Sequence, residues 1–134
     1  DLQEKYQEFK KVNCEIYAIS TDTHFAHKTW HDISENISKI EYPMIGDPTH
    51  SLTYDFDVFD ENDGLAQRGS FIIDPEGKIV VYEVNAGNVG RNAEELLRRL
   101  HACQFVYEHG NNVCPAKWKL GEKTIQTTIE NIGK

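Results

Sequence analysis

The sequence predicts an α/β fold, in which helices pack against a sheet, and three observations support this class. Apolar residues at helical spacing, Leu2, Tyr6 and Phe9, open the chain. A short apolar run follows them, and two further apolar runs flank a four-residue turn at residues 74–77. The order helix, strand, helix, hairpin and helix is typical of an α/β layer rather than of a helical bundle or a β-sandwich.

The first third of the chain alternates short helices and strands. Residues 2–11 have the pattern of an amphipathic helix, and residues 14–19 form a short, mostly apolar strand. Three good N-cap residues at 21–23 predict a helix over residues 24–30. A second short helix is expected over residues 33–40, and it must end before the Tyr-Pro pair that follows.

The clearest strands lie in the middle of the chain. Residues 46–49 are a turn or the start of a helix, and the acidic residues 60–64 form a loop. Residues 70–73 and 78–84 are the strands, and the Asp-Pro-Glu-Gly sequence between them places Pro second and Gly fourth, as in a type I turn. We therefore expect an antiparallel hairpin.

A long helix follows the hairpin and leads into a polar tail. Asn92 is its N-cap, Glu95 completes the pattern of a capping box, and the helix ends near Gly110. Its apolar stripe consists of Leu96, Leu97, Leu100 and Cys103. Residues 111–134 are Lys-rich with isolated apolar side chains, too few to fold alone. The chain therefore divides into residues 1–110 and a tail, 111–134.

Composition limits the classes of partner. The chain of 134 residues can bury one core but not two, and no apolar run approaches the ~20 residues of a membrane helix. The net charge of -8 opposes binding to nucleic acid or to anionic lipid, which requires Lys and Arg. Three sparse cysteines are typical of a reducing compartment, so we expect a soluble, cytoplasmic protein.

Cys114 is the candidate redox residue. It lies in the polar tail near Lys117 and Lys119, where a cysteine can become an accessible thiolate and attack another sulfur. A buried structural cysteine is the alternative, and the residues alone leave both open. Cys14, on a strand, and Cys103, on an apolar helix stripe, are expected to be structural, and a Cys-x-x-Cys pair is absent.

Two other patterns have simpler explanations. His24, His27 and His31 share one helix face and could in principle hold a metal, but no fourth ligand stands at a recognisable spacing. The Gly-Asn-Val-Gly sequence at 87–90 lacks the three-glycine fingerprint of nucleotide binding and is explained by a turn before a helix. We expect no metal and no cofactor.

Arg68 opens the strand at residues 70–73. A permanent cation at the end of a strand can point out of the sheet towards a site. On the residues alone, a solvated surface arginine is the favoured interpretation.

Five stretches distributed over nearly the whole chain carry a family resemblance. They are Ser-Thr-Asp-Thr-His-Phe at 20–25, with His-Lys at 27–28 and Trp-His at 30–31; Met-Ile-Gly-Asp-Pro at 44–48; Gly-Leu-Ala-Gln-Arg-Gly at 64–69; Phe-Ile-Ile-Asp-Pro at 71–75; and Val-Cys-Pro-Ala-Lys-Trp at 113–118. Together they resemble the peroxidase component of alkyl hydroperoxide reductase, a bacterial peroxiredoxin of the typical two-cysteine class.

The resemblance implies roles for two residues. In that family a peroxidatic thiolate attacks the peroxide O–O bond, becomes a sulfenic acid and condenses with a resolving cysteine of the partner subunit. Cys114 matches the resolving position. Arg68 matches the family's conserved arginine through its Leu-Ala-x-Arg context, which reverses the interpretation of Arg68 as a surface residue.

The resemblance also implies a thioredoxin-like peroxiredoxin fold that is N-terminally incomplete. The peroxidatic motif, Phe-Val-Cys-Pro-Thr-Glu-Leu, would end just before Asp1, so residues 1–110 would be the C-terminal part of the domain and the tail would carry the resolving cysteine. A central strand between residues 14–19 and the hairpin would be missing. We therefore expect a divided sheet, marginal stability and no activity of this chain alone.

By the same resemblance, the expected function is a thiol-dependent peroxidase that reduces hydrogen peroxide and alkyl hydroperoxides without metal or haem. The expected partners are a second copy in a homodimer, which can build a decamer, and a flavoprotein disulfide reductase or thioredoxin-like reductant. The alternative is a non-catalytic redox-interaction or assembly fragment of a peroxiredoxin.

Overall fold

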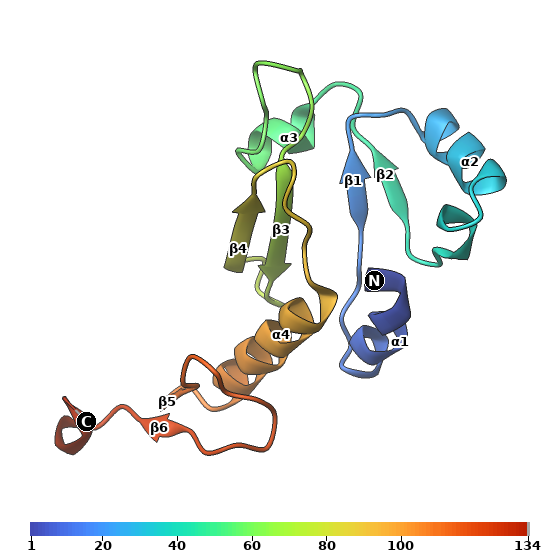
Figure 1. Ribbon diagram of the computed structural model, residues 1–134. Helices are drawn as coiled ribbons and strands as arrows, with labels where there is room; N and C mark the ends of the chain where they lie inside the picture. The colour runs from blue at the N-terminus through green and yellow to red at the C-terminus, as the bar shows by residue number, and fades with distance from the viewer. Residues whose placement is uncertain (134) are drawn as a thin grey trace.

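The computed structural model describes residues 1–133 and shows helices around a divided sheet (Figure 1). In chain order the elements are α1 (Leu2–Lys11), β1 (Ala18–Ser20), α2 (His24–Ile33), the 3-10 helix η1 (Ile37–Lys39), β2 (Met44–Gly46), α3 (Ser51–Asp55), β3 (Arg68–Ile73), β4 (Ile79–Asn85), α4 (Ala93–Glu108), β5 (Asn112–Val113), β6 (Ile125–Gln126) and the 3-10 helix η2 (Ile129–Asn131). The predicted order of helix, strand, helix, hairpin and helix is confirmed.

The two first helices agree closely with the sequence pattern. α1 has the predicted bounds and buries Tyr6 and Phe9. The Thr23 hydroxyl caps α2 by accepting a hydrogen bond from the amide of Ala26 at 3.2 Å. α2 continues to Ile33, three residues beyond its predicted end, because no helix-breaking residue stands at the predicted boundary.

The segment between α2 and α3 differs from its prediction. The helix expected over residues 33–40 is a single 3-10 turn, η1, and the following β2 was not predicted because three residues show no periodicity. β2 runs parallel to β1, with Ala18 opposite Met44. Its last residue, Gly46, approaches the Asp22 carbonyl so closely that a Cβ would lie 2.7 Å from that oxygen. Only glycine fits there.

The predicted hairpin is confirmed. β3 and β4 pair antiparallel, with Arg68 opposite Asn85. The turn closes through a 3.0 Å hydrogen bond from the Gly77 amide to the Asp74 carbonyl, and Gly77 has a positive φ of 82°. That conformation favours glycine at the last position of the turn.

α4 packs along α1 and closes the core. The Asn92 side chain accepts a 2.9 Å hydrogen bond from the Glu95 amide, as predicted for an N-cap. The Glu95 carboxylate binds Arg98 and Arg99 instead of returning to the cap, so only half of the predicted capping box forms. The core consists of Tyr6, Phe9, Ile16, Tyr42, Ile72, Leu97 and Leu100.

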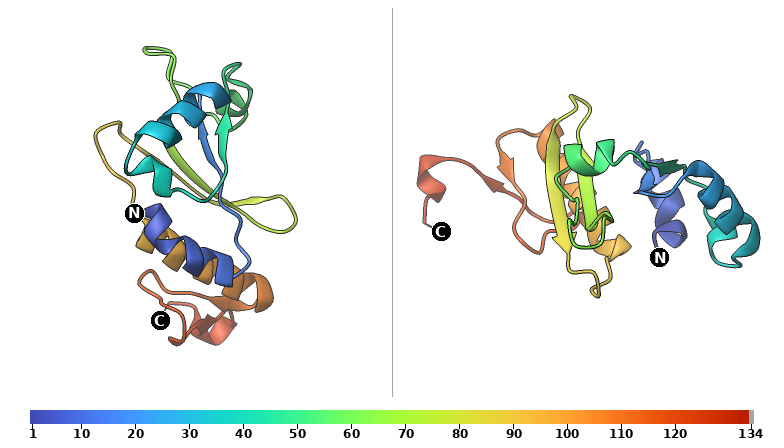
Figure 2. Two further views of the ribbon diagram at one scale, coloured as in Figure 1. Left: turned by 90° about the vertical axis from the view of Figure 1, so that its right-hand side faces the viewer. Right: turned by 90° about the horizontal axis from the view of Figure 1, so that it is seen from above.

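The sheet is divided, as the resemblance predicted. Strands β1 and β2 form one pair, β3 and β4 a second, and β5 and β6 a third. Within residues 1–133, no ladder joins β1 to β3, and the β1–β2 pair lies beside the β3–β4 pair without joining it in Figure 1 and in the right view of Figure 2. Each of these strands therefore has an edge of backbone donors and acceptors without strand partners.

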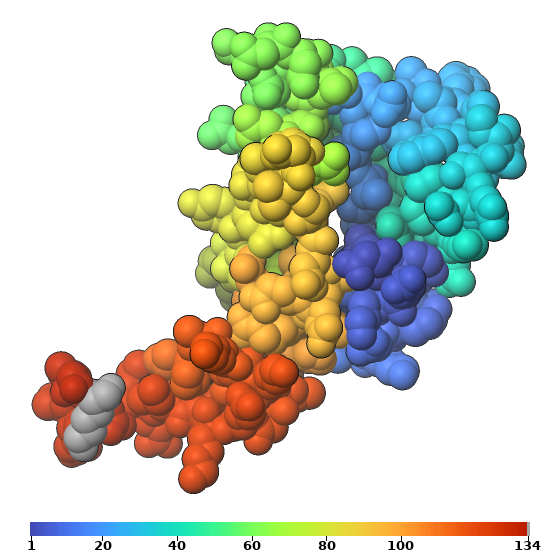
Figure 3. Space-filling model, in the orientation of Figure 1, coloured from blue at the N-terminus to red at the C-terminus, as the bar shows by residue number. Residues whose placement is uncertain are grey.

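The tail is folded, and it takes up its structure against α4 rather than on its own. β5 and β6 pair antiparallel, and the intervening loop places Trp118 against α4 with 2% of its surface exposed. Figure 3 shows the tail, orange to red, as a lobe attached to the body of the molecule at α4. One large aromatic side chain provides the anchor that the isolated isoleucines do not.

Across the described residues, none of the helices is both long and apolar enough to cross a lipid bilayer.

Candidate functional site

Arg68 lies at the first residue of β3, where its side chain is exposed. Its Nε donates a 2.6 Å hydrogen bond to the carbonyl of Gly87, in the loop between β4 and α4. The guanidinium is therefore fixed at the end of the strand and keeps its other N–H donors available to an anionic group.

A second arginine, which the sequence analysis did not single out, lies in the same corner. Arg91 Nη1 donates a 2.7 Å hydrogen bond to the carbonyl of Gly69, the residue after Arg68. Arg68 on β3 thus binds the 86–92 loop, and Arg91 on that loop binds β3. Burial raises the pKa of Tyr42, and the positive charge of Arg91 opposes that rise. The positive charge of Arg91 therefore also influences Tyr42, which lies just before β2.

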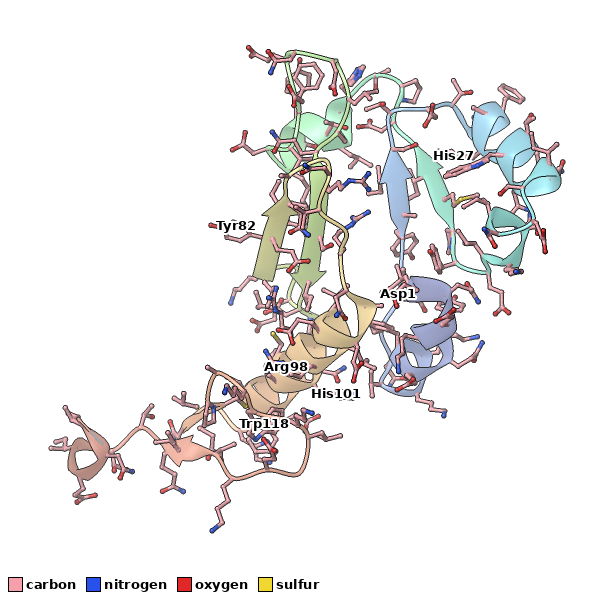
Figure 4. The ribbon with its side chains drawn as sticks, viewed as in Figure 1. Asp1, His27, Tyr82, Arg98, His101 and Trp118 are labelled. Atoms are coloured by element: carbon pink, nitrogen blue, oxygen red, sulfur yellow. The ribbon has the colours of Figure 1, made fainter. Side chains whose placement is uncertain are left out.

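The amino ends of two helices meet beside this corner. The Asp1 carboxylate accepts a 2.8 Å hydrogen bond from the amide of Ala93, the first residue of α4 (Figure 4). Helix amino ends carry partial positive charge, and the two arginines add full charges. The arrangement, which we call the arginine corner (Arg68, Arg91 and the start of α4), therefore favours an anion such as a thiolate.

Cys114 lies elsewhere, against the middle of α4. Its sulfur is 3.9 Å from the carbonyl oxygen of Ala102, and its side chain is half-buried. Burial raises the pKa of the Cys114 thiol, and the charge of Arg98 opposes this. The tail sequence predicted an exposed thiolate at Cys114. The thiol is half-buried instead, because the loop that carries it folds onto α4.

The other two cysteines have structural surroundings, as predicted. Cys14 packs against the core, and burial raises the pKa of both Cys14 and Cys103. Protonated thiols in such positions behave as small apolar side chains.

The two predicted site residues do not come together in one chain. Arg68 binds the loop just before α4, whereas Cys114 contacts Ala102 on that helix. Ala93 and Ala102 are separated by nine residues, which corresponds to about 14 Å along a helix axis. A disulfide requires its two Cα atoms within about 7 Å, so a thiol in the arginine corner could not reach Cys114 as it lies here.

The three histidines of α2 do not converge. His27 pairs with the Ser20 hydroxyl at 2.7 Å, and His31 contacts the Ile40 carbonyl at 3.2 Å. His24 packs on Phe25. Residues 1–133 contain no group of three or more His, Cys, Asp or Glu side chains placed to hold a metal ion.

Comparison with known proteins identifies the family. The model described as AhpC/TSA family matches residues 1–82, and the one described as C-terminal domain of 1-Cys peroxiredoxin matches residues 102–132. Alkyl hydroperoxide reductase C of Bacillus subtilis is 52% identical over the whole chain, which covers 72% of that relative. The chain belongs to the AhpC/TSA family. It is a peroxiredoxin, and peroxiredoxins are enzymes of the peroxidase class.

Solved peroxiredoxin structures share the fold. The crystal structure of Enterococcus faecalis AhpC is 53% identical with a TM-score of 0.83, over 86% of this chain and 69% of that one. The reduced 2-Cys peroxiredoxin of Plasmodium vivax is 28% identical with a TM-score of 0.91, over 96% of this chain and 67% of that one. This peroxiredoxin therefore has the thioredoxin-like fold.

Proposed function

We propose that this peroxiredoxin reduces hydrogen peroxide and alkyl hydroperoxides through a disulfide between two subunits, with Cys114 as the resolving cysteine. The observation that carries the proposal is the position of Cys114. It lies in the tail against Ala102 of α4, about 14 Å along the helix from the arginine corner, so a thiol in that corner needs a Cys114 from another copy.

The chemistry proceeds in two balanced steps. A peroxidatic thiolate attacks the terminal oxygen of the hydroperoxide, the O–O bond breaks, and the alkoxide leaves as an alcohol after taking up a proton. The cysteine becomes a sulfenic acid. The Cys114 thiolate then attacks that sulfur, hydroxide leaves as water, and the disulfide forms. A reductant supplies two electrons and two protons to restore both thiols.

The peroxidatic cysteine belongs, by family resemblance, to a motif that directly precedes Asp1. Asp1 binds the amide of Ala93, two residues after Arg91, and this supports placing the peroxidatic cysteine close to the arginine corner. There, Arg68 and Arg91 would stabilise the thiolate and the negative charge that develops on the leaving oxygen.

The homodimer, its further assembly to a decamer, and a flavoprotein disulfide reductase or thioredoxin-like reductant are part of the same proposal. So are a cytoplasmic location and the assignment of residues 111–134 as a separate tail.

A non-catalytic role as a redox-interaction or assembly fragment is the second candidate. Large apolar side chains are exposed on β4 and on the tail, where Tyr82 is 73% and Ile129 is 87% accessible. Such surfaces bind other proteins or further copies of the same chain.

A direct experiment separates the two candidates. Peroxide consumption is measured for the 134-residue chain and for the chain extended through the Phe-Val-Cys-Pro-Thr-Glu-Leu motif. We expect no turnover from the chain alone and turnover from the extended chain, with a dimer band on a non-reducing gel. Replacing Cys114 by Ser in the extended chain removes that band and leaves a sulfenic acid. A dimer band that persists in this variant would show that Cys114 is not the resolving cysteine.

A further inference from the structure

The loop that carries Cys114 is held on one face of α4. Arg98, Ala102 and Phe105 are four and three residues apart and therefore share a helix face. Cys114 contacts the Ala102 carbonyl, and the rings of Phe105 and Trp118 lie 5.2 Å apart. The tail segment 114–118 therefore lies along this face.

Arg98 makes a charge-assisted hydrogen bond between α4 and that segment. Its Nη1 donates a 2.9 Å hydrogen bond to the Trp118 carbonyl, while Nε and Nη2 form a two-pronged bond to Glu95 at 2.7 and 2.9 Å. Figure 4 shows Arg98 on α4 directly beside Trp118. The bond to Glu95 immobilises the guanidinium, so Arg98 meets the tail with little further loss of side-chain entropy.

We propose that Arg98 is a positioning residue for the resolving thiol: it fastens the Cys114 segment to α4 through the Trp118 carbonyl and places a permanent cation one helical turn from Ala102, which the thiol contacts. This inference rests on the proposed function only in calling Cys114 the resolving cysteine.

The electrostatics of Cys114 agree with this role. Burial raises the pKa of the Cys114 thiol, and Arg98 is the charged group of α4 that opposes the rise. Cys103, on the same helix, has a pKa raised by burial and then by the Cys114 thiolate. A thiol that burial keeps protonated does not attack a sulfenic acid. Arg98 thus offsets, in part, the cost of docking the thiol against the helix.

Arg99 provides a matched control. It is the neighbouring arginine and also binds Glu95, at 2.9 Å, but its other partner is Glu83 on β4 rather than the tail. Replacing it removes the same charge and one of the same contacts while leaving the bond to Trp118 in place.

The test follows the alkylation of Cys114 by iodoacetamide as a function of pH, with each cysteine-containing peptide quantified by mass spectrometry. The midpoint of the profile reports the thiol pKa, and its plateau reports accessibility. In Arg98→Gln we expect the plateau rate to rise about fivefold, because a charge-assisted contact that holds the tail is lost. Arg98→Lys, which also loses the two-pronged geometry but keeps the charge, should raise the plateau as well, and its midpoint should lie at lower pH than that of Arg98→Gln.

Arg99→Gln should leave both quantities unchanged. An Arg98→Gln profile identical to that of the unaltered chain would overturn the inference, and so would an equal effect from Arg99→Gln. If Arg98→Gln also exposes Cys14, the fold has been lost and Arg98→Lys decides: a raised plateau with Cys14 still protected supports the inference, and an unchanged plateau refutes it. No peroxide is used, so these results are independent of whether Cys114 resolves a sulfenic acid.

Discussion

Arg68 and Arg91 hold each other's surroundings in place through backbone carbonyls. Each uses part of its guanidinium to bind the segment from which the other projects. This arrangement fixes two positive charges between β3 and the loop that leads into α4 before any substrate arrives. The unfavourable free energy of bringing two like charges together is therefore part of the folding free energy and does not add to the activation free energy of the reaction.

Removing one of these charges should affect rate more than folding. In the chain extended through the peroxidatic motif, we expect Arg68→Met to lower the rate constant for reaction with peroxide by about 100-fold, the usual effect of losing one such donor. Stopped-flow measurement under single-turnover conditions checks this. Lys78→Met, which removes an exposed cation in the hairpin turn, is the control and should leave the rate unchanged. An unaltered rate in Arg68→Met would exclude it from the site.

Glu95 makes the stability of α4 sensitive to acid. Hydrogen bonds from Arg98 hold the pKa of the Glu95 carboxyl at about 2, against 4.5 in its unperturbed state. A depressed pKa contributes stability that is complete above pH 4.5 and is lost as the pH falls towards 2.

Glu95→Gln should therefore reduce the loss of stability between pH 4.5 and pH 2, measured by urea unfolding at each pH. Glu76→Gln, which removes an exposed carboxylate paired with Lys78, is the comparison and should leave the acid dependence nearly intact. Equal slopes in Glu95→Gln and the unaltered chain would contradict the assigned pKa.

At the scale of elements, strongly periodic segments could be predicted from the sequence and short ones could not. α1, the β3–β4 hairpin and α4 each present a repeating apolar pattern with a recognisable cap or turn. β2 has three residues, and its pairing with β1 depends on a close approach at Gly46 that only the folded chain reveals.

The tail illustrates the same limit. Its order depends on one side chain, Trp118, and on a bond from Arg98, twenty residues away. The candidate site likewise contains residues that the sequence could predict and one that it could not. Cys114 and Arg68 have recognisable sequence contexts, whereas Arg91 becomes visible only through its bond to the Gly69 carbonyl. Contacts between distant segments leave no local pattern in a single sequence.

Replacing Trp118 should undock the tail without unfolding the body. Trp118→Ala removes a side chain that is 2% exposed, and we expect the docked state to lose about 3 kcal/mol. Hydrogen exchange should show loss of protection at residues 112–126 and retained protection in α1. Trp30→Ala, at a side chain that is 51% exposed, is the control. Loss of protection throughout the chain would contradict the independence of the tail.

At the scale of the whole molecule, the divided sheet is the dominant feature. β1 and β3 face each other across a position that no strand of residues 1–133 fills, and the core is continuous mainly through α1, α4 and Tyr42. Facing edges with unpaired backbone groups readily accept a strand from another copy.

We therefore expect the 134-residue chain to self-associate as its concentration rises and to unfold with low cooperativity. Sedimentation velocity over a range of concentrations, together with thermal melting, checks both properties. A peptide that supplies the expected central strand should suppress association and sharpen the transition. A monomer that unfolds cooperatively without the peptide would show that the divided sheet is self-sufficient.

The two tryptophans also give the molecule an intrinsic optical signal. Trp118 is almost wholly enclosed between α4 and the tail, whereas half of Trp30 faces water. Indole emission shifts to longer wavelength on contact with water, so the spectrum of the chain is the sum of a blue and a red component. In a variant that retains only Trp118, emission colour alone would follow the departure of the Cys114 segment from α4 in real time, with no label attached near the thiol.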